Sequence, residues 1–206
     1  MSFDVVMARM AQLQGLIAPA AAPATPPATV TTTAPTTAFA TQLQSASSTA
    51  TLTTTQPASS AGQAIVNLVS QEVGVSEQPP GSNDSPRIAQ FRQATAGSGV
   101  GPWCAYFTSW AAREAGVPLG DNSQGFGRVD DVYAWAQKAG KAIPNTGGDV
   151  KPQPGDLIVW DEHIGVVESV GADGTINTIE GNSSDQVSKR SYAPGARPAI
   201  GYVRLG

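Results

Sequence analysis

The chain has 206 residues and a formal net charge of −4, and it contains one cysteine and one histidine. An acidic balance without clustered Lys and Arg argues against a nucleic-acid partner. A single cysteine excludes an intramolecular disulfide and a zinc site built from several thiolates, and no apolar run reaches the ~18 residues of a membrane-spanning helix.

Residues 1–17 are predicted to form a short amphipathic helix. Its apolar residues recur at spacings of three and four, as in a short coiled coil: Phe3, Val6, Met10, Leu13 and Ile17. Because so short a helix is barely stable alone in water, we expect it to bind a protein partner, with a frayed tail as the alternative. The segment lacks the basic cluster and apolar centre of an ordinary secretory signal.

Residues 18–60 consist mainly of Ala, Thr, Pro and Ser, with no charged residue between Arg9 and Glu72. Few of these side chains can build a core, so the entropy of ordering the backbone is not offset. We expect a flexible linker, followed by a catalytic domain at residues 61–206.

The first half of that domain is predicted to be helical. Ser60 and Gln63 have the spacing of a capping box before an apolar face that ends at Gly74. Ser85-Pro86 has the pattern of an N-cap followed by proline in the first helical turn. A third helix begins at Cys104 and ends at Gly116, and a fourth runs from Val129 to Gly140.

The second half is predicted to form strands, at residues 157–160, 164–169, 175–180 and 199–205. Gly171-Ala-Asp-Gly174 supplies a hairpin turn between the second and third of these. Helices followed by antiparallel strands indicate an α+β domain in which the sheet packs on the helix that carries Cys104.

Cys104 and His163 are the candidate nucleophile and base. Each residue taken alone is more often structural than catalytic. Cys104, however, opens a helix, where the helix dipole and the free amide groups of the first turn favour a thiolate. His163 stands at the start of one predicted strand, just before residue 164, and Glu180 ends the next, so a short hairpin brings them together. Glu180, or alternatively Asn182, could then orient the imidazole, an arrangement typical of papain-like cysteine hydrolases.

Four motifs in this order resemble the CHAP domain, a cysteine- and histidine-dependent amidohydrolase/peptidase family related to the NlpC/P60 group. They are Pro102-Trp-Cys-Ala-Tyr-Phe-Thr-Ser-Trp110, Pro154-Gly-Asp-Leu157, His163-Ile-Gly165-Val-Val167 and Glu180-Gly-Asn182. The Gly81-Ser-Asn83 loop and the segment 192–204 also resemble phage- and bacteria-associated members. The resemblance covers residues 62–206.

The resemblance implies cleavage of an amide bond in bacterial peptidoglycan, by an amidase or an endopeptidase. Cys104 would be the nucleophile and His163 the general base and later acid. Glu180 would be the third member and Asn182 a supporting or alternative third member. Trp103 and Tyr106 are candidates for lining the substrate cleft, although aromatic residues at this spacing are more often part of a core.

Some CHAP domains bind calcium, but the acidic or amide pairs at 83–84, 121–122 and 130–131 lack the alternating oxygen spacing of a calcium loop. We therefore expect no metal and no cofactor. The alternatives to a wall hydrolase are a non-catalytic binding or assembly module with the same fold, and acyl transfer or hydrolysis on an amide outside the wall. The expected location is extracellular, wall-associated or in a phage particle.

Overall fold

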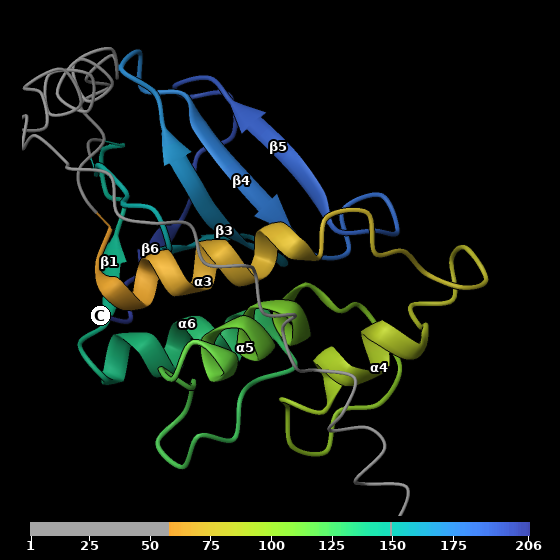
Figure 1. Cartoon of the computed structure of the whole chain (residues 1–206). Coiled ribbons are helices and arrows are strands. Elements are labelled where there is room, and N and C mark those ends of the chain that lie inside the picture. The colour runs from red at the N-terminus through yellow and green to blue at the C-terminus, as the bar shows by residue number, and fades with distance from the viewer. Residues whose placement is uncertain (1–57, 149) are drawn as a thin grey trace, which may run out of the picture. The chain divides into compact units, whose positions relative to one another are not determined.

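The computed structural model describes residues 58–148 and 150–206, in which helices come first and strands follow. The helices are α3 (Ser60–Gln71), α4 (Pro86–Arg92), α5 (Cys104–Glu114) and α6 (Val129–Lys138). The strands are β1 (Ala142–Pro144), β2 (Leu157–Trp160), β3 (His163–Val170), β4 (Ile176–Glu180), β5 (Ser188–Tyr192) and β6 (Gly201–Val203). They form one antiparallel sheet in the order β1-β6-β2-β3-β4-β5, of which Figure 1 shows β4 and β5 side by side. The predicted α+β class is confirmed.

The predicted N-terminal helix and nearly all of the predicted linker lie outside the described residues. None of the helices described from residue 58 onward has both the length and the apolar character needed to cross a membrane.

The two predicted helix caps differ in outcome. The predicted capping box at Ser60 is wrong: Ser59 is the N-cap of α3, its Oγ accepts a hydrogen bond from the amide of Gly62 at 2.9 Å, and Gly62 has no side chain to complete a box. The cap at Ser85 is confirmed: its Oγ accepts from the amide of Ile88 at 3.3 Å, and Pro86 occupies the first turn of α4. A buried cap matters here because it satisfies amide groups that helix geometry leaves free.

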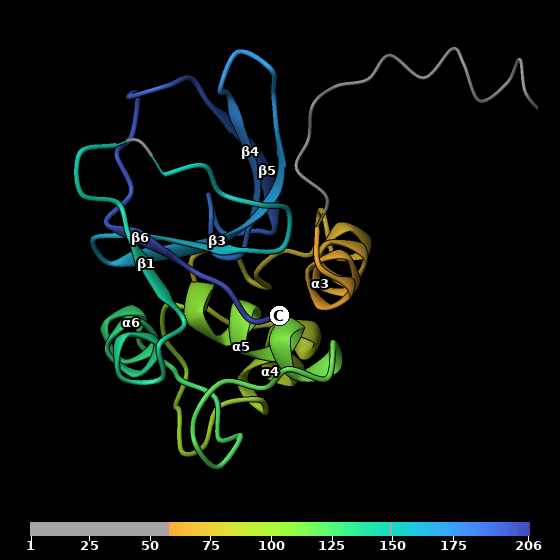
Figure 2. The same ribbon diagram turned by 90° about the vertical axis from the view of Figure 1, so that its left-hand side faces the viewer.

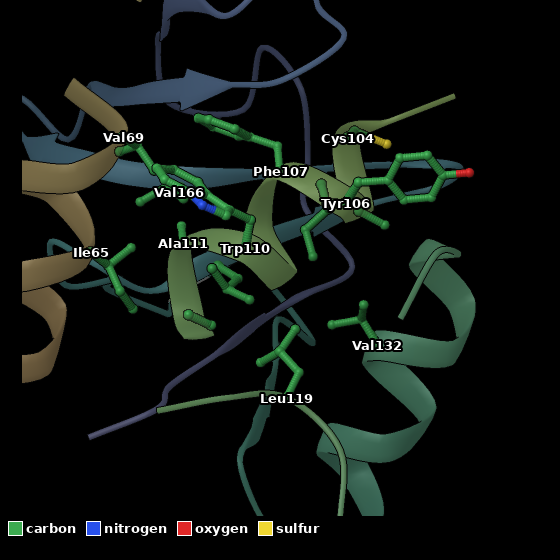
Figure 3. Close-up of a cluster of buried hydrophobic side chains, with 14 of the residues drawn as sticks. Ile65, Val69, Cys104, Tyr106, Phe107, Trp110, Ala111, Leu119, Val132 and Val166 are labelled. Atoms are coloured by element: carbon green, nitrogen blue, oxygen red, sulfur yellow. The ribbon is translucent and has the colours of Figure 1, made fainter. Parts of the chain in front are cut away.

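Helix α5 is the centre of the core. It contacts the three other described helices and β3, and Figure 2 shows the helices on one side of the sheet. Every residue from 104 to 112 is buried, and Gly116 ends the helix with a φ of +78°. Figure 3 shows Phe107 and Trp110 of α5 packed toward Ile65 and Val69 of α3. The helix that carries Cys104 is therefore held rigidly on several sides.

Strand β2 is buried along its whole length. Leu157 and Val159 belong to the main core, whereas Ile158 and Trp160 belong to a second cluster with Val167, Ala199 and Tyr202. Because side chains alternate along a strand, this division means that both faces of β2 are covered. That explains why the strand reads as an unbroken apolar run.

Two strands were not predicted. Strand β5, with the sequence Ser-Lys-Arg-Ser-Tyr, is the edge of the sheet beside β4, and polar residues dominate it. Strand β1 has three residues and includes Pro144, which is compatible with an edge position. Neither has the apolar pattern by which an internal strand is recognised. The predicted 171–174 turn is confirmed, with the Gly174 amide donating to the Gly171 carbonyl at 2.9 Å.

The Pro154-Gly-Asp motif anchors the sheet to α3. Gly155 has a φ of +89°, and a Cβ placed there would lie 2.2 Å from the Cα of Gly62. The buried Asp156 carboxylate accepts from Arg204 Nε at 2.9 Å and Nη2 at 2.6 Å, and from the amide of Gln153 at 2.7 Å. A buried carboxylate requires such partners. This motif therefore stabilises the fold.

Candidate active site

Cys104 is the first residue of α5 and is buried. The preceding N-cap residue, Trp103, makes no capping hydrogen bond with its side chain. The amide groups of the first helical turn are therefore not occupied by a cap, and they lie at the positive end of the helix dipole. An anion that forms at Cys104, or on a substrate atom bonded to it, would be stabilised there.

His163 is placed by a tight connection between β2 and β3. Trp160 and His163 are opposite each other in the sheet, with two residues between them, and the second of these, Glu162, has a φ of +59°. The rings of Trp160 and His163 are stacked, with centroids 5.7 Å apart and an interplanar angle of 24°. The imidazole is therefore held by both the hairpin and a neighbouring ring.

Glu180 is the carboxylate beside the imidazole. Its Oε2 lies 2.8 Å from His163 Nε2, and the side chain is only 1% exposed. Its other oxygen, Oε1, accepts hydrogen bonds from Thr178 Oγ1 at 2.6 Å and from the Tyr192 hydroxyl at 2.9 Å. Because Nε2 is engaged with Glu180, Nδ1 is the nitrogen left for the interaction with Cys104.

The surroundings of His163 favour its protonated form. Burial alone would lower the pKa of His163, but interactions with Cys104 and Glu180 outweigh burial and raise this pKa from 6.5 to about 9. For Glu180, burial would raise the pKa, yet the hydrogen bond and charge of His163, together with the Thr178 hydroxyl, lower it below 4.5. The pair is therefore an imidazolium and a carboxylate at neutral pH.

Asn182 does not reach the imidazole. It follows β4 with a φ of +56°, and with its amide oriented to suit its neighbours it links two other groups. Its Nδ2 donates to Glu77 Oε1 at 3.3 Å, and its Oδ1 accepts from the Trp103 amide at 3.2 Å. The structure thus brings together Cys104, His163 and Glu180. Asn182 instead contacts the backbone of Trp103, the residue before Cys104.

Glu77 is a buried carboxylate that the sequence did not single out. Its Oε1 accepts from Trp103 Nε1 at 2.9 Å, and its Oε2 accepts from the Asn83 amide at 2.8 Å. With the contact to Asn182, Glu77 ties the 77–83 loop to the residue before Cys104. The sequence around Glu77 does not indicate that it bonds Trp103 and Asn182, because these partners are distant in sequence.

A cavity of about 300 Å³ lies beside Cys104. Tyr106 lines it and donates a hydrogen bond to the Gly99 carbonyl at 3.0 Å, and charged residues border it: Arg128, Asp130 and Glu162. Figure 3 shows the Cys104 sulfur and the Tyr106 ring at the same end of α5. Trp103, in contrast, is fully buried and does not line the cavity. A larger cavity of about 550 Å³ includes neither Cys104 nor His163, so we place the site at the smaller one.

The acidic pairs considered for calcium have structural partners. Asp84 accepts from Arg92 at 3.1 Å, Asp121 accepts from Trp135 Nε1 at 2.9 Å, and Asp130 and Asp131 lie in the first turn of α6. Within residues 58–148 and 150–206, no group of three or more His, Cys, Asp or Glu side chains is arranged to hold a metal ion.

Gly165 gives a direct test of the Glu180 position. An alanine Cβ at this site would lie 2.7 Å from Glu180 Cγ, and Gly165 does not have a positive φ, so alanine fits its backbone. We expect Gly165→Ala to displace the carboxylate and lower kcat/KM by about 10- to 100-fold, because catalytic geometry tolerates little misplacement. The measurement is amide hydrolysis by folded variants. Gly99→Ala is the control, since its Cβ would meet open space, and equal activity in both variants would contradict the prediction.

Comparison with known proteins agrees with this geometry. A family model of the CHAP domain matches residues 95–182, from just before α5 to just after β4. A search of curated proteins gave no match. The chain therefore contains a CHAP domain, of the cysteine- and histidine-dependent amidohydrolase/peptidase family, and Cys104, His163 and Glu180 all lie inside the matched segment.

Proposed function

We propose that this protein is a peptidoglycan hydrolase that cleaves an amide bond through a thioester on Cys104. The observation that carries the proposal is the buried Glu180 carboxylate, which lies 2.8 Å from His163 Nε2. Interactions with Cys104 and Glu180 raise the pKa of this imidazole, although burial alone would lower it. A nucleophile, a base and an orienting carboxylate are the parts that such chemistry requires.

In the proposed reaction, the Cys104 thiolate attacks the amide carbon and the C–N bond breaks after His163 has protonated the leaving nitrogen. This step releases an amine and leaves the acyl group on sulfur as a thioester. His163, now neutral, takes a proton from water, whose oxygen attacks the thioester carbon. The C–S bond then breaks, which releases a carboxylic acid and regenerates the thiolate and the imidazolium. The backbone amide of Cys104 is the proposed donor to the oxyanion.

The cavity beside Cys104 supports a peptide substrate. Its border combines the cationic Arg128 with the anionic Asp130 and Glu162, so a short peptide that carries charges of both signs would find partners there. The buried Tyr106 adds an aromatic wall. Such a substrate is consistent with an amidase or with an endopeptidase, and it would place the protein's action at the bacterial cell wall.

The test is digestion of purified peptidoglycan by the full-length protein, beside Cys104→Ala, with products identified by mass spectrometry. New amine and carboxyl termini made only by the wild type would support the proposal, and their identity would distinguish amidase from endopeptidase. A folded wild type that leaves several wall types intact would contradict it. That result would favour a non-catalytic module or action on an amide outside the wall.

A further inference from the structure

The third hydrogen bond to Glu180 comes from Tyr192, a residue of the edge strand β5. The Tyr192 hydroxyl lies 2.9 Å from Glu180 Oε1. A carboxylate can only accept, so the single hydroxyl proton points at Glu180 and the phenol oxygen remains free to accept. Arg197 Nη1 donates to that oxygen at 3.1 Å. A continuous hydrogen-bonded chain therefore runs from Arg197 through Tyr192 to Glu180, whose other oxygen pairs with His163.

Arg197 reaches the imidazole by a second route. Its guanidinium lies 4.3 Å from the centre of the Trp160 ring, and its backbone carbonyl accepts from Trp160 Nε1 at 3.1 Å. Trp160 is buried and is stacked on His163. Tyr192 packs against Trp160 as well, with ring centroids 5.4 Å apart. Tyr192 thus contacts both Glu180 and Trp160, which lie beside the imidazole, and Arg197 contacts Tyr192 and Trp160.

We propose that Tyr192 and Arg197 are positioning residues of the active site, which fix Glu180 and Trp160 and through them the orientation of the His163 ring. This inference rests on the proposed function, because it assigns the two residues to the Cys104–His163 chemistry. Neither residue lines the cavity beside Cys104, and both line the larger cavity, which Cys104 does not border.

The physical reason is the number of bonds that hold the carboxylate. Without the Tyr192 hydroxyl, Oε1 keeps only Thr178 as a side-chain donor, and Thr178 lies just two residues away on the same strand. Tyr192 is the partner that comes from a neighbouring strand, and it opposes rotation of the carboxylate away from His163. Outer partners of this kind typically contribute 10- to 100-fold to activity where they orient an imidazole.

The decisive variants are Tyr192→Phe and Arg197→Ala. Tyr192→Phe keeps the ring and its packing and removes only the hydroxyl. We expect kcat to fall by about 10- to 100-fold with little change in KM, because the substrate contacts are intact. Arg197 is exposed, so Arg197→Ala is expected to fold, with a smaller loss of kcat that Arg197→Lys partly restores. Tyr133→Phe, on α6, is the matched control for loss of a hydroxyl.

A second readout separates this inference from the choice of substrate. Cys104 is the only cysteine, so its alkylation by iodoacetamide reports the state of the thiol without any wall substrate. We expect Tyr192→Phe to slow alkylation at pH 6 by about tenfold, because a misplaced His163 ring no longer activates the thiol. If the wild type leaves peptidoglycan intact but this slowing is observed, the positioning role stands and the substrate proposal fails. The inference would be overturned if both decisive variants had the same kcat and the same alkylation rate as the wild type, with unchanged circular dichroism.

Discussion

Replacement of Cys104 by serine is expected to lower kcat/KM by about 10,000-fold or more while the fold is retained. Serine has nearly the volume of cysteine and keeps the helix start, so the buried position at the first residue of α5 is not disturbed. A serine hydroxyl is almost never ionised near neutral pH, and an imidazolium beside it cannot act as its base. Losses of this size are typical when the nucleophile of a catalytic unit is removed. The measurement is steady-state hydrolysis of a defined amide substrate.

Cys104→Ala provides the comparison for the serine variant. If Cys104 is the nucleophile, alanine and serine should be equally inactive and should unfold at nearly the same temperature as the wild type. A serine variant that retained activity within about tenfold of the wild type would mean that the thiol is not the attacking group. Ser109→Ala, farther along α5, would show how much activity depends on the helix itself, because the Ser109 hydroxyl bonds the Phe126 backbone outside the site.

The residues brought together at the site are those whose positions follow from local rules. Cys104 stands out as the only thiol and starts a helix whose end is marked by Gly116. His163 and Glu180 lie on strands that a short turn connects, so their proximity follows from the hairpin alone. Beyond this short-range geometry, the predictions need only the packing of the sheet on the helix that carries Cys104, which the α+β pattern indicates.

The supporting residues depend on contacts that sequence patterns do not describe. Glu77 meets Trp103 and Asn182 across long stretches of chain. Tyr192 lies on an edge strand whose polar composition hides it, although it contacts the same carboxylate as His163. Helix rotation also separates Trp103 from Tyr106: both lie within two residues of Cys104 in sequence, but only Tyr106 lines the cavity. Which neighbour is core and which is cleft depends on the packing of α5, which no local pattern specifies.

Glu180→Gln is expected to lower kcat/KM by about 1,000- to 10,000-fold, although it changes the shape of the side chain very little. The hydroxyls of Thr178 and Tyr192 both donate to one carboxylate oxygen, so the glutamine carbonyl is expected to take that position. Its amide group then points at His163 Nε2, which must accept. The proton of a neutral imidazole is thereby forced onto Nδ1, where it cannot receive another from Cys104. A wrong tautomer of this kind costs about 10,000-fold in a serine protease.

The same variant should alter the pH dependence in a defined direction. In the wild type, interactions that outweigh burial raise the pKa of His163 to about 9, so the imidazolium persists up to that pH and kcat/KM should fall above it. Loss of the Glu180 charge removes part of this effect, so the residual activity of Glu180→Gln should decline at lower pH than that of the wild type.

The free energy of unfolding gives an independent check on this pair. A raised histidine pKa contributes stability that is fully present below about pH 6.5 and is lost as the pH rises to about 9. The lowered pKa of Glu180 contributes above about pH 4.5 and is lost as the pH falls below that value. The stability difference between wild type and Glu180→Gln should therefore be largest between about pH 4.5 and 6.5 and smaller at pH 9.5. Glu168→Gln, at the exposed pair with Lys189, is the control, and an equal pH dependence in both variants would contradict a charged His163–Glu180 pair.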